Sequence, residues 1–528
     1  MKAIFLLLIV YSIGSYGQSY QFEVILKEKD TVQYNNSSPT DYLTAEAVSR
    51  KNKHFVPITP NDFPVTISYL DSLNKYYKVK AVSKWFNLSV VQTNDSLSID
   101  TLKNFPFVES YKFIGKSDFS VSRISRKNEI TEINYGSASA GINQVKGEYL
   151  HNNNYLGENI TIAVLDAGFQ NTNSMNIFTS LFNEQRIIAE KNFIFPATDV
   201  YGLDLHGTQV LSVLAGNKDG EYVGSAPKSN YILLVTEDVR EENLIEEYIW
   251  TQGAEYADSL GANIINSSLG YNTFDTQVFD HLQSELGKST AMVSKGARTA
   301  VQKGMLVISS AGNEGESSWK NLLFPADEEL VLTVGAVNIQ GNHVDFSSTS
   351  PTHINFVKPT VAVLGEKVGI SSGNGIYSSA NGTSFACPII SGLAACLWQA
   401  LPNKNQHEIK SIIEQSAHQY NSPDKQIGYG IPDFSQTIEH ILYSNQTKAP
   451  ILFPNPTSTS LITLHHQSTF KVIDVILFDH TGKPQNKVIF KETNEERTTL
   501  TLPTLSVGSY FLTFITDLGL FQKQLIVN

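Results

Sequence analysis

The sequence predicts an α/β fold, a mostly parallel sheet covered by helices, preceded by a small α+β domain and followed by a small β-sandwich. In the middle of the chain, apolar runs near residues 160, 231, 262, 305 and 331 alternate with helical patterns near 206, 241, 290, 384 and 405. That rhythm is typical of βαβ units. The first hundred residues mix strand and helix patterns, and short alternating strands follow Lys448. A chain of 528 residues has room for about three such domains.

The first seventeen residues have the pattern of a secretory signal peptide. Met1-Lys2 precedes the apolar run Ala3 to Val10, and small residues follow up to Gly17, where we expect cleavage. An N-terminal core strand is the alternative. No later stretch reaches the ~18 consecutive apolar residues of a transmembrane helix, so we expect no membrane span.

Residues 18–135 are predicted to form an N-terminal domain and a linker. The strand patterns cover Phe22 to Leu26 and Ser83 to Val91, and the helical patterns cover Thr40 to Lys51 and Val65 to Tyr76. The polar stretch Ser117 to Ser139 is predicted to be the exposed linker.

In the middle domain, one carboxylate is placed for chemistry. Asp166 ends the apolar run that begins at Ile160, and Ala167-Gly168 turns the chain directly after it. The run is typical of a buried parallel strand, and ligands of open α/β sheets bind at the carboxyl ends of such strands.

His206 and Ser384 each open a predicted helix. His206 begins a helical pattern that ends at Gly216, and Ser384 lies in Asn381-Gly382-Thr383-Ser384, which leads into an apolar helix. A serine hydroxyl needs a base to become a nucleophile, histidine titrates near neutral pH, and a buried carboxylate can hold its ring. We therefore expect that any hydrolysis by this serine rises with pH as His206 loses its proton through roughly pH 6 to 7.

An oxyanion formed on a substrate carbonyl needs donors that already point at it. The core strand Met305 to Ser310 is followed by Ala311-Gly312-Asn313, which places the Asn313 amide at the same edge of the sheet. The backbone amide of Ser384, at a helix start, can supply a second donor.

In their order, these residues resemble the subtilisin-like serine proteases, or subtilases, from about Ile160 to Ser435. The resemblance rests on Asp166-Ala167-Gly168, His206-Gly207-Thr208, Gly224-Ser225-Ala226-Pro227, Ala311-Gly312-Asn313 and the segment Gly382 to Pro388. It implies that Asp166 orients the base His206, that Ser384 is the nucleophile and that Asn313 completes the oxyanion hole. It also implies that extended substrate pairs with Ser267, Leu269, Gly270, Ala311 and Gly312.

Three positions depart from the family pattern. Ala167 replaces the usual Ser or Thr, Gln209 stands where His is frequent, and Tyr271 replaces a usual second glycine, which leaves the side-chain preference open. The resemblance implies no cofactor for catalysis. A structural calcium ion is a family-level option for which the sequence locates no ligands, and we name no metal site.

The resemblance implies a peptidase domain at residues 136–446, with proteins or peptides as substrates. The position of residues 18–135, between a signal peptide and this domain, indicates a propeptide that assists folding and blocks the cleft until it is removed. A permanent substrate-binding or docking domain is the alternative for the N-terminal part. For the whole chain, the alternative to a secreted serine endopeptidase is an inactive cell-surface binding protein that kept the fold.

Residues 447–528 resemble the C-terminal sorting domains of type IX secretion. The resemblance rests on Pro454-Asn455-Pro456, Phe478 to Gly482, Gly508 to Leu512 and Lys523 to Asn528. It implies the type IX machinery as a partner and a secreted or outer-surface location on a Gram-negative bacterium. A carbohydrate- or protein-binding β module is the alternative.

The net charge bears on possible partners, and the cysteine content bears on disulfide bonds. The formal net charge of −12 argues against a nucleic-acid partner. Cys387 and Cys396 lie nine positions apart on one predicted helix, about 13 Å along its axis, so a disulfide between them is excluded. Both are expected to pack as small apolar side chains.

Overall fold

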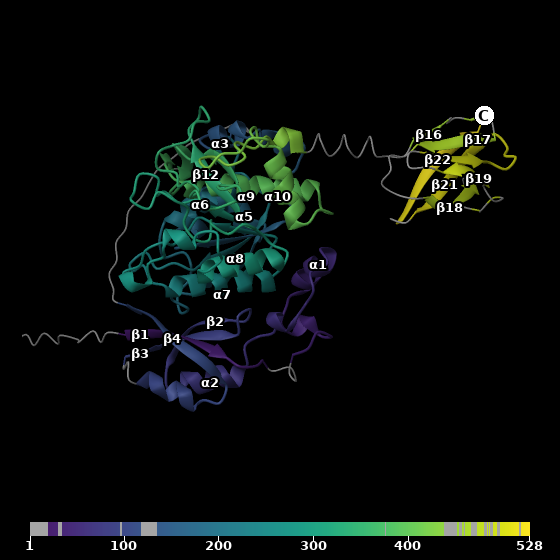
Figure 1. Cartoon of the computed structure of the whole chain (residues 1–528). Helices are drawn as coiled ribbons and strands as arrows, with labels where there is room; N and C mark the ends of the chain where they lie inside the picture. The colour runs from purple at the N-terminus through teal and green to yellow at the C-terminus, as the bar shows by residue number, and fades with distance from the viewer. Residues whose placement is uncertain are drawn as a thin grey trace, which may run out of the picture. The chain divides into compact units, whose positions relative to one another are not determined.

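The computed structural model describes residues 19–29, 34–94, 98–117, 135–374 and 376–437, and parts of residues 451–527. The chain divides into two compact units, residues 1–437 and 438–528 (Figure 1). The predicted signal peptide and most of the predicted linker lie outside the described residues.

The N-terminal domain is a four-stranded antiparallel sheet with helices. The order of its strands is β2-β3-β1-β4. Its elements are β1 (Ser19–Leu26), α1 (Ala45–Lys53), α2 (Ile67–Asn74), β2 (Lys78–Ser83), β3 (Leu88–Thr93), a 3-10 helix at Ser98–Asn104 and β4 (Val108–Ser117). This confirms the α+β prediction, with differences in its strands. The run Ser83 to Val91 is a turn followed by most of β3, because Asn87 in that turn has a positive φ of 50°. The strands β2 and β4 were not predicted.

The next domain contains a seven-stranded sheet in which all neighbouring strands are parallel. The strand order is β13-β12-β11-β10-β5-β9-β6. The strands are β5 (Thr161–Asp166), β6 (Ile187–Asn192), β9 (Asn230–Val235), β10 (Ile264–Ser267), β11 (Leu306–Ser310), β12 (Leu332–Val337) and β13 (Val361–Leu364). The five predicted strands are present. The sheet also includes β6 and β13, which we did not predict. The strand β6 was missed because several of its residues are exposed, so its sequence lacks a continuous apolar run.

Helices cover this sheet. The main ones are α6 (His206–Ala215), α7 (Ile245–Ser259), α8 (Met292–Gln302), α9 (Thr383–Ala400) and α10 (Gln406–Gln415), and all five were predicted. Shorter elements are α3 (Ser139–Gln144), α4 (Glu148–Asn152), α5 (Thr179–Asn183), and the strand pairs β7 (Asn217–Lys218) with β8 (Tyr222–Val223) and β14 (Val368–Ser371) with β15 (Tyr377–Ala380).

The central helix α9 is almost entirely buried. Within the described residues it is the one helix long and apolar enough to cross a membrane, but 83% of its apolar window lies inside the protein. Pro388 lies inside this helix and removes the N–H that would bond to the Ser384 carbonyl, but that carbonyl accepts the Ser268 hydroxyl instead at 2.8 Å. Cys387 and Cys396 are both free and buried on this helix, as predicted.

The N-terminal domain packs on α7 and α8, which Figure 1 shows between β2 and the large sheet. Trp85 and Leu88 share one apolar cluster with Trp250 of α7 and Val293 of α8. Glu255 of α7 also accepts the backbone N–H groups of Lys84 (2.7 Å) and Trp85 (3.0 Å). Apolar packing and backbone hydrogen bonds therefore fix the hairpin on the helices.

A buried ion cluster forms a second contact between these domains. Lys51 of α1 is fully buried and bridges Asp258 of α7 (2.9 Å) and Asp62 (3.4 Å). Lys303, directly after α8, binds Asp62 at 2.7 Å, and Arg50 pairs with Asp258. The pKa of Asp258 is about 2, since the opposing cations outweigh its burial.

The C-terminal unit has two antiparallel sheets. One has the order β16-β17-β20-β19 and the other β18-β21-β22. The strands are β16 (Ile451–Phe453), β17 (Leu461–His465), β18 (Val472–Asp479), β19 (Ile489–Thr493), β20 (Arg497–Thr501), β21 (Gly508–Thr516) and β22 (Gly519–Val527). Both sheets contribute to one apolar core that includes Ile462, Leu464, Leu477 and Phe514. This is the predicted β-sandwich. The predicted turn at His480 to Gly482 lies outside the described residues.

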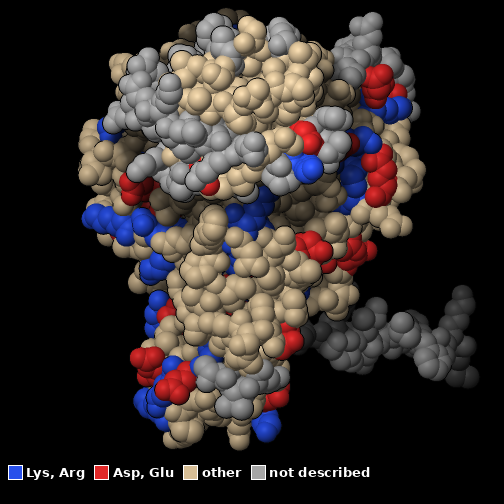
Figure 2. Space-filling model, turned by 90° about the vertical axis from the view of Figure 1, so that its right-hand side faces the viewer, with Lys and Arg blue, Asp and Glu red and all other residues tan. Residues whose placement is uncertain are grey.

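Lysine and arginine do not gather into one stripe on the face that Figure 2 shows. They are mixed there with aspartate and glutamate. That face therefore offers no continuous basic track for a phosphate backbone.

We predict that Lys51→Met lowers the free energy of unfolding of the full chain by about 2 kcal/mol or more, because it leaves buried carboxylates with less opposing charge. The measurement is urea unfolding in a Ser384→Ala background, which prevents self-digestion. The matched control is Lys112→Met, since Lys112 pairs with Glu23 from a side chain that is 61% exposed, and its loss should cost less than about 1 kcal/mol. Equal effects of the two substitutions would contradict a buried ion cluster.

Candidate active site

The large sheet brings several polar segments to one edge. Strands β11, β10, β5 and β9 are neighbours and parallel, so the segments after them meet at the carboxyl edge of the sheet. An open cavity of about 390 Å³ lies there. It is lined by Ala167, His206, Glu237, Asp238, Val239, Glu242, Ser268, Leu269, Gly270, Ser310, Gly312, Asn313, Glu314, Leu323, Thr383 and Ser384.

Asp166 and His206 are in direct contact. Asp166 is the last residue of β5 and is fully buried, and its Oδ1 accepts hydrogen bonds from His206 Nδ1 (2.8 Å) and from the Ala167 amide (2.8 Å). His206 opens α6. Gly207 permits the close approach of that helix to β5, since a Cβ there would meet the Gly168 carbonyl at 2.3 Å and Asp166 Cγ at 3.0 Å.

This contact sets the state of the imidazole. Donation from Nδ1 to Asp166 leaves Nε2 of the neutral ring as the acceptor. Burial opposes the charged ring, but the Asp166 charge, its hydrogen bond and nearby Asp204 together raise the pKa of His206 above 6.5. The midpoint near pH 6 to 7 that the sequence suggested therefore moves upward.

Ser384 lies in the first turn of α9 and lines the same cavity as His206. Its Oγ donates to the Ser268 carbonyl at 3.3 Å, and Ser268 Oγ donates to the Ser384 carbonyl at 2.8 Å. These two bonds connect the start of α9 to the end of β10. The Ser384 hydroxyl has to turn away from Ser268 before it can give its proton to His206.

The orientation of the Asn313 amide is fixed by Thr383. Asn313 Oδ1 accepts hydrogen bonds from the backbone amide (2.9 Å) and the hydroxyl (3.1 Å) of Thr383. Because both donors contact the oxygen, the Nδ2 group is the end of the amide that remains to donate elsewhere. Asn313 and Ser384 thus present donors to the same cavity.

The predicted substrate-pairing residues separate into two groups. Leu269, Gly270 and Gly312 line the cavity. Ser267 and Ala311 are buried in the core instead. Ser267 Oγ accepts from Trp250 Nε1 (2.9 Å), and the amide and carbonyl of Ala311 pair with Val334 and Leu323 (2.9 and 3.0 Å). Their polar groups are already paired because both residues still belong to the interior of the sheet.

Several lining residues were not predicted from the sequence. Glu237 and Asp238 follow β9 as Asp166 ends β5, and that position at a strand end could have indicated them. Leu323 gave no such signal. Its side chain reaches the cavity from the segment before β12 and lies against Gly270 and Gly312.

Cys387 is one turn from Ser384, but it is not suited to nucleophilic chemistry. It is fully buried, and burial raises the pKa of its thiol to about 12. The thiol therefore stays protonated at neutral pH.

Comparison with known proteins identifies the family. Residues 157–430, just over half of the chain, match the model of the subtilase family, peptidase S8. The chain belongs to the subtilase family. Residues 21–131 match the peptidase S8 propeptide domain of Bacteroidota, and residues 451–528 match a secretion system C-terminal sorting domain.

Individual subtilases resemble the chain over the same region. Subtilisin E of Bacillus subtilis (strain 168) is 28% identical over 306 residues, which cover 57% of this chain and 71% of that protein. A subtilisin of Bacillus pumilus is 29% identical over 285 residues, covering 53% and 92%. The solved structure of the prenylagaramide maturation protease PagA is 26% identical, covers 56% of this chain and 98% of that one, and has a TM-score of 0.44.

The family and the flanking domains give the chain its general function. It is a serine endopeptidase with an N-terminal propeptide, secreted or located at the outer cell surface. The alternative of an inactive binding protein is not favoured.

We predict that Gly312→Ala lowers stability by about 2 kcal/mol or more and reduces peptidase activity. Gly312 has a φ of 106°, and a Cβ would meet Leu323 Cγ at 2.6 Å and Ser348 Oγ at 2.8 Å. The control is Gly202→Ala, whose Cβ would find its nearest neighbour at 3.8 Å. Thermal unfolding and peptide hydrolysis of both variants test this, and a wild-type-like Gly312→Ala would show that the wall of the cavity is looser than described.

Proposed function

We propose that Asp166, His206, Ser384 and Asn313 carry the endopeptidase chemistry. The observation that supports it most is the 2.8 Å hydrogen bond between Asp166 and His206 at a cavity that Ser384 and Asn313 also line. A carboxylate, a base, a hydroxyl nucleophile and an amide donor are the groups that acyl transfer needs.

In the first half of the reaction, Ser384 Oγ gives its proton to His206 Nε2 and attacks the carbonyl carbon of the scissile peptide bond. The negative oxygen that forms accepts from Asn313 Nδ2 and from the Ser384 backbone amide. His206 then passes the proton to the leaving nitrogen, the C–N bond breaks and an acyl-enzyme remains.

In the second half, a water molecule gives a proton to His206 Nε2 and attacks the ester carbonyl. The same donors hold the oxyanion, the proton returns to Ser384 Oγ and the carboxylic acid product leaves. Asp166 accepts the Nδ1–H hydrogen bond and keeps the ring in the tautomer that both halves require.

Substrate pairing is part of the proposal. We assign it to Leu269, Gly270 and Gly312, and we leave Ser267 and Ala311 out because they lie in the core. An extended peptide between the segments after β10 and β11 would lie beside Ser384. We expect no cofactor in catalysis, and we assign no calcium ligands.

We further propose the domain limits 1–17 for the signal peptide, 18–135 for the propeptide and linker, 136–446 for the peptidase and 447–528 for the sorting domain. The three family matches fall inside these limits. The propeptide would inhibit the enzyme until it is removed, and the last domain would engage the type IX secretion machinery, a route across a Gram-negative outer membrane. We assign no nucleic-acid partner.

We predict that Ser384→Ala abolishes hydrolysis of an unstructured protein substrate, and that Asn313→Ala reduces kcat by about 10²–10³, the range known for removal of this donor in subtilisin itself. Steady-state kinetics of the processed enzyme measures both. For Ser384→Ala, which cannot process itself, the linker is cut by an added protease. Asn321→Ala, an amide on a loop outside the cavity, serves as the control and should keep its rate.

The pH dependence gives a second test. A protonated His206 cannot accept the serine proton, and the pKa of His206 is raised, so activity should be lost as the pH falls through a midpoint above 6.5. The acid limb of a kcat/KM profile measures that midpoint. A profile that peaks near pH 4 and declines by pH 8 would rule out a histidine base.

A further inference from the structure

One wall of the cleft is acidic. Glu237, Asp238 and Glu242 line the same cavity as His206 and Ser384. The first two follow β9, and Glu242 lies in the segment that leads into α7. Carboxylates are therefore part of the surface that a bound peptide would contact.

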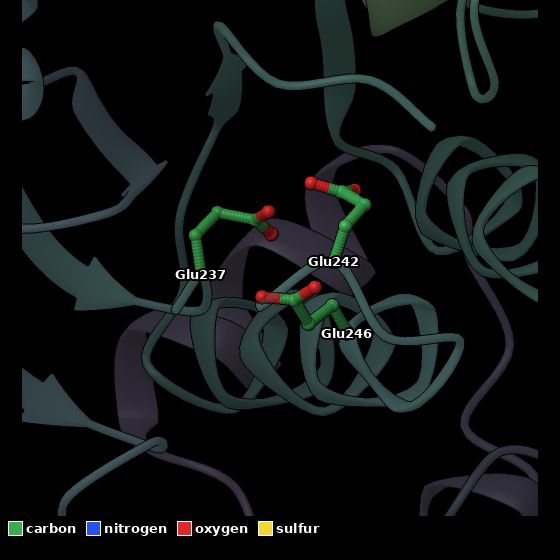
Figure 3. Close-up of side chains that lie close together, drawn as sticks. All are labelled: Glu237, Glu242 and Glu246. Carbon is green, nitrogen blue, oxygen red and sulfur yellow. The ribbon is translucent and has the colours of Figure 1, made fainter. Parts of the chain in front are cut away.

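Three of the acidic side chains in this region point toward one another, as Figure 3 shows for Glu237, Glu242 and Glu246. Their carboxylate oxygens lie within 4.8 Å of one another. Glu246 is only 2% exposed, and its oxygens accept the backbone N–H groups of Asp238 (2.7 Å) and Asn243 (2.9 Å). Glu242 is the exposed member of the cluster.

Tyr271 fixes the position of Glu237. This tyrosine is 1% exposed, and its hydroxyl donates to Glu237 Oε1. Tyr271 occupies one of the positions where the sequence departs from the family pattern, and its hydroxyl holds a carboxylate at the wall of the cleft. The departure thus changes the chemistry of the substrate surface.

The cluster has no cationic partner among the described residues. Asp238 is paired with Arg240 (2.6 Å), but Glu237, Glu242 and Glu246 form no salt bridge within the described part of the chain. Burial and neighbouring carboxylates raise the pKa of Glu237 and Glu246 well above 4.5, which favours the neutral form of these two carboxyl groups. A cation that entered the cluster would lower these pKa values and stabilise the ionised forms.

Two features of the chain indicate that this cation is a lysine or arginine side chain. Lys80 of the N-terminal domain lines a small neighbouring cavity together with Asp238, Glu241 and Glu246. In addition, the sequence between the N-terminal domain and the peptidase domain contains Arg123, Arg126 and Lys127 within five positions. A protease that removes its own propeptide has to accept a segment of this composition as its first substrate.

We propose that Glu237 and Glu242 determine substrate specificity, and that the enzyme selects peptides that place a lysine or arginine side chain against them. This inference rests on the proposed function, because it concerns the cleft beside Ser384. It specifies a class of substrate, namely basic segments of proteins, that membership of the family does not.

A peptide side chain fits the cluster better than a metal ion. A calcium ion takes six to eight oxygen ligands. The three carboxylates have six oxygens in total, and three of these already accept a hydrogen bond within the protein, two on Glu246 from backbone amides and one on Glu237 from Tyr271. An ammonium or guanidinium group needs fewer acceptors and can enter through the open side of the cleft.

The test compares kcat/KM of the processed enzyme for fluorogenic peptides that differ at one position among the four residues before the scissile bond. Arginine, lysine and norleucine are placed there in turn. We expect at least a tenfold preference for a basic residue at one position. Glu242→Gln should reduce that preference, expressed as the ratio of kcat/KM for the basic peptide to kcat/KM for the norleucine peptide, at least about fivefold.

The matched control is Glu316→Gln, an exposed charge near the cleft that does not line it. It should keep the preference, which separates direct contact from the general field of the protein. Calcium binding to the wild type and Glu242→Gln is measured in parallel by titration calorimetry.

Each result decides the matter. Cleavage of all peptides without a basic preference, or a preference that survives Glu242→Gln, overturns the specificity proposal and leaves the proposed function intact. Calcium binding that is lost in Glu242→Gln makes the cluster a metal site and also overturns it. Failure to cleave any peptide removes the proposed function, and the specificity proposal with it.

Discussion

The parallel register of four neighbouring strands is the constraint on which the site depends. Strands β11, β10, β5 and β9 end at the same edge of the sheet, and each is followed by a residue of the cleft. Asn313 follows β11, Ser268 follows β10, Asp166 ends β5 and Glu237 follows β9. The two remaining groups, His206 and Ser384, come from the starts of α6 and α9, which pack against each other. The packing of the core thus sets the distances between the side chains of the candidate site.

The sequence predicted those parts of the site that follow from local patterns. Asp166 at a strand end and His206 and Ser384 at helix starts needed only apolar periodicity and turn residues to be located. Glu237 was missed although its position after β9 could have indicated it, and Glu242 was missed because nothing in the sequence tells which of many scattered acidic residues will face a cavity. Leu323 was missed for a similar reason, since its contacts with Gly270 and Gly312 exist only in the folded sheet.

The fold was predicted most reliably where whole segments are buried. Strands such as β5 and β12 are buried throughout and mostly apolar, and they were located within a few residues. The edge strand β6 is half exposed, and its polar residues interrupt the apolar pattern that predicts a buried strand. The turn between β2 and β3 was predicted as part of one strand, Ser83 to Val91, because the positive φ of Asn87 that makes the turn is not evident from an asparagine alone. The sequence also could not tell that Ser267 and Ala311 are buried in the core. A shift of one or two positions along the chain, to Leu269 or Gly312, moves a residue from the core to the cleft.

The N-terminal domain connects the fold to the control of activity. It buries Lys51 and Arg50 against Asp258, and it covers α7 and α8 with an apolar sheet surface. Breaking a buried ion pair costs free energy, because each charge is left without a partner away from water. The contact therefore favours the intact, folded precursor. The same helix α7 begins beside the acidic wall of the cleft, so the element that holds the N-terminal domain also carries Glu246.

The most direct test of this account is labelling of the purified, processed protein with a serine-directed fluorophosphonate, beside the Ser384→Ala variant, followed by intact-mass analysis. The account predicts one adduct on the wild type and none on the variant, with a mass that shows the N-terminal domain removed. Adducts on both proteins would place the nucleophile elsewhere. The absence of an adduct on a wild type that has lost its N-terminal domain would contradict an activated Ser384.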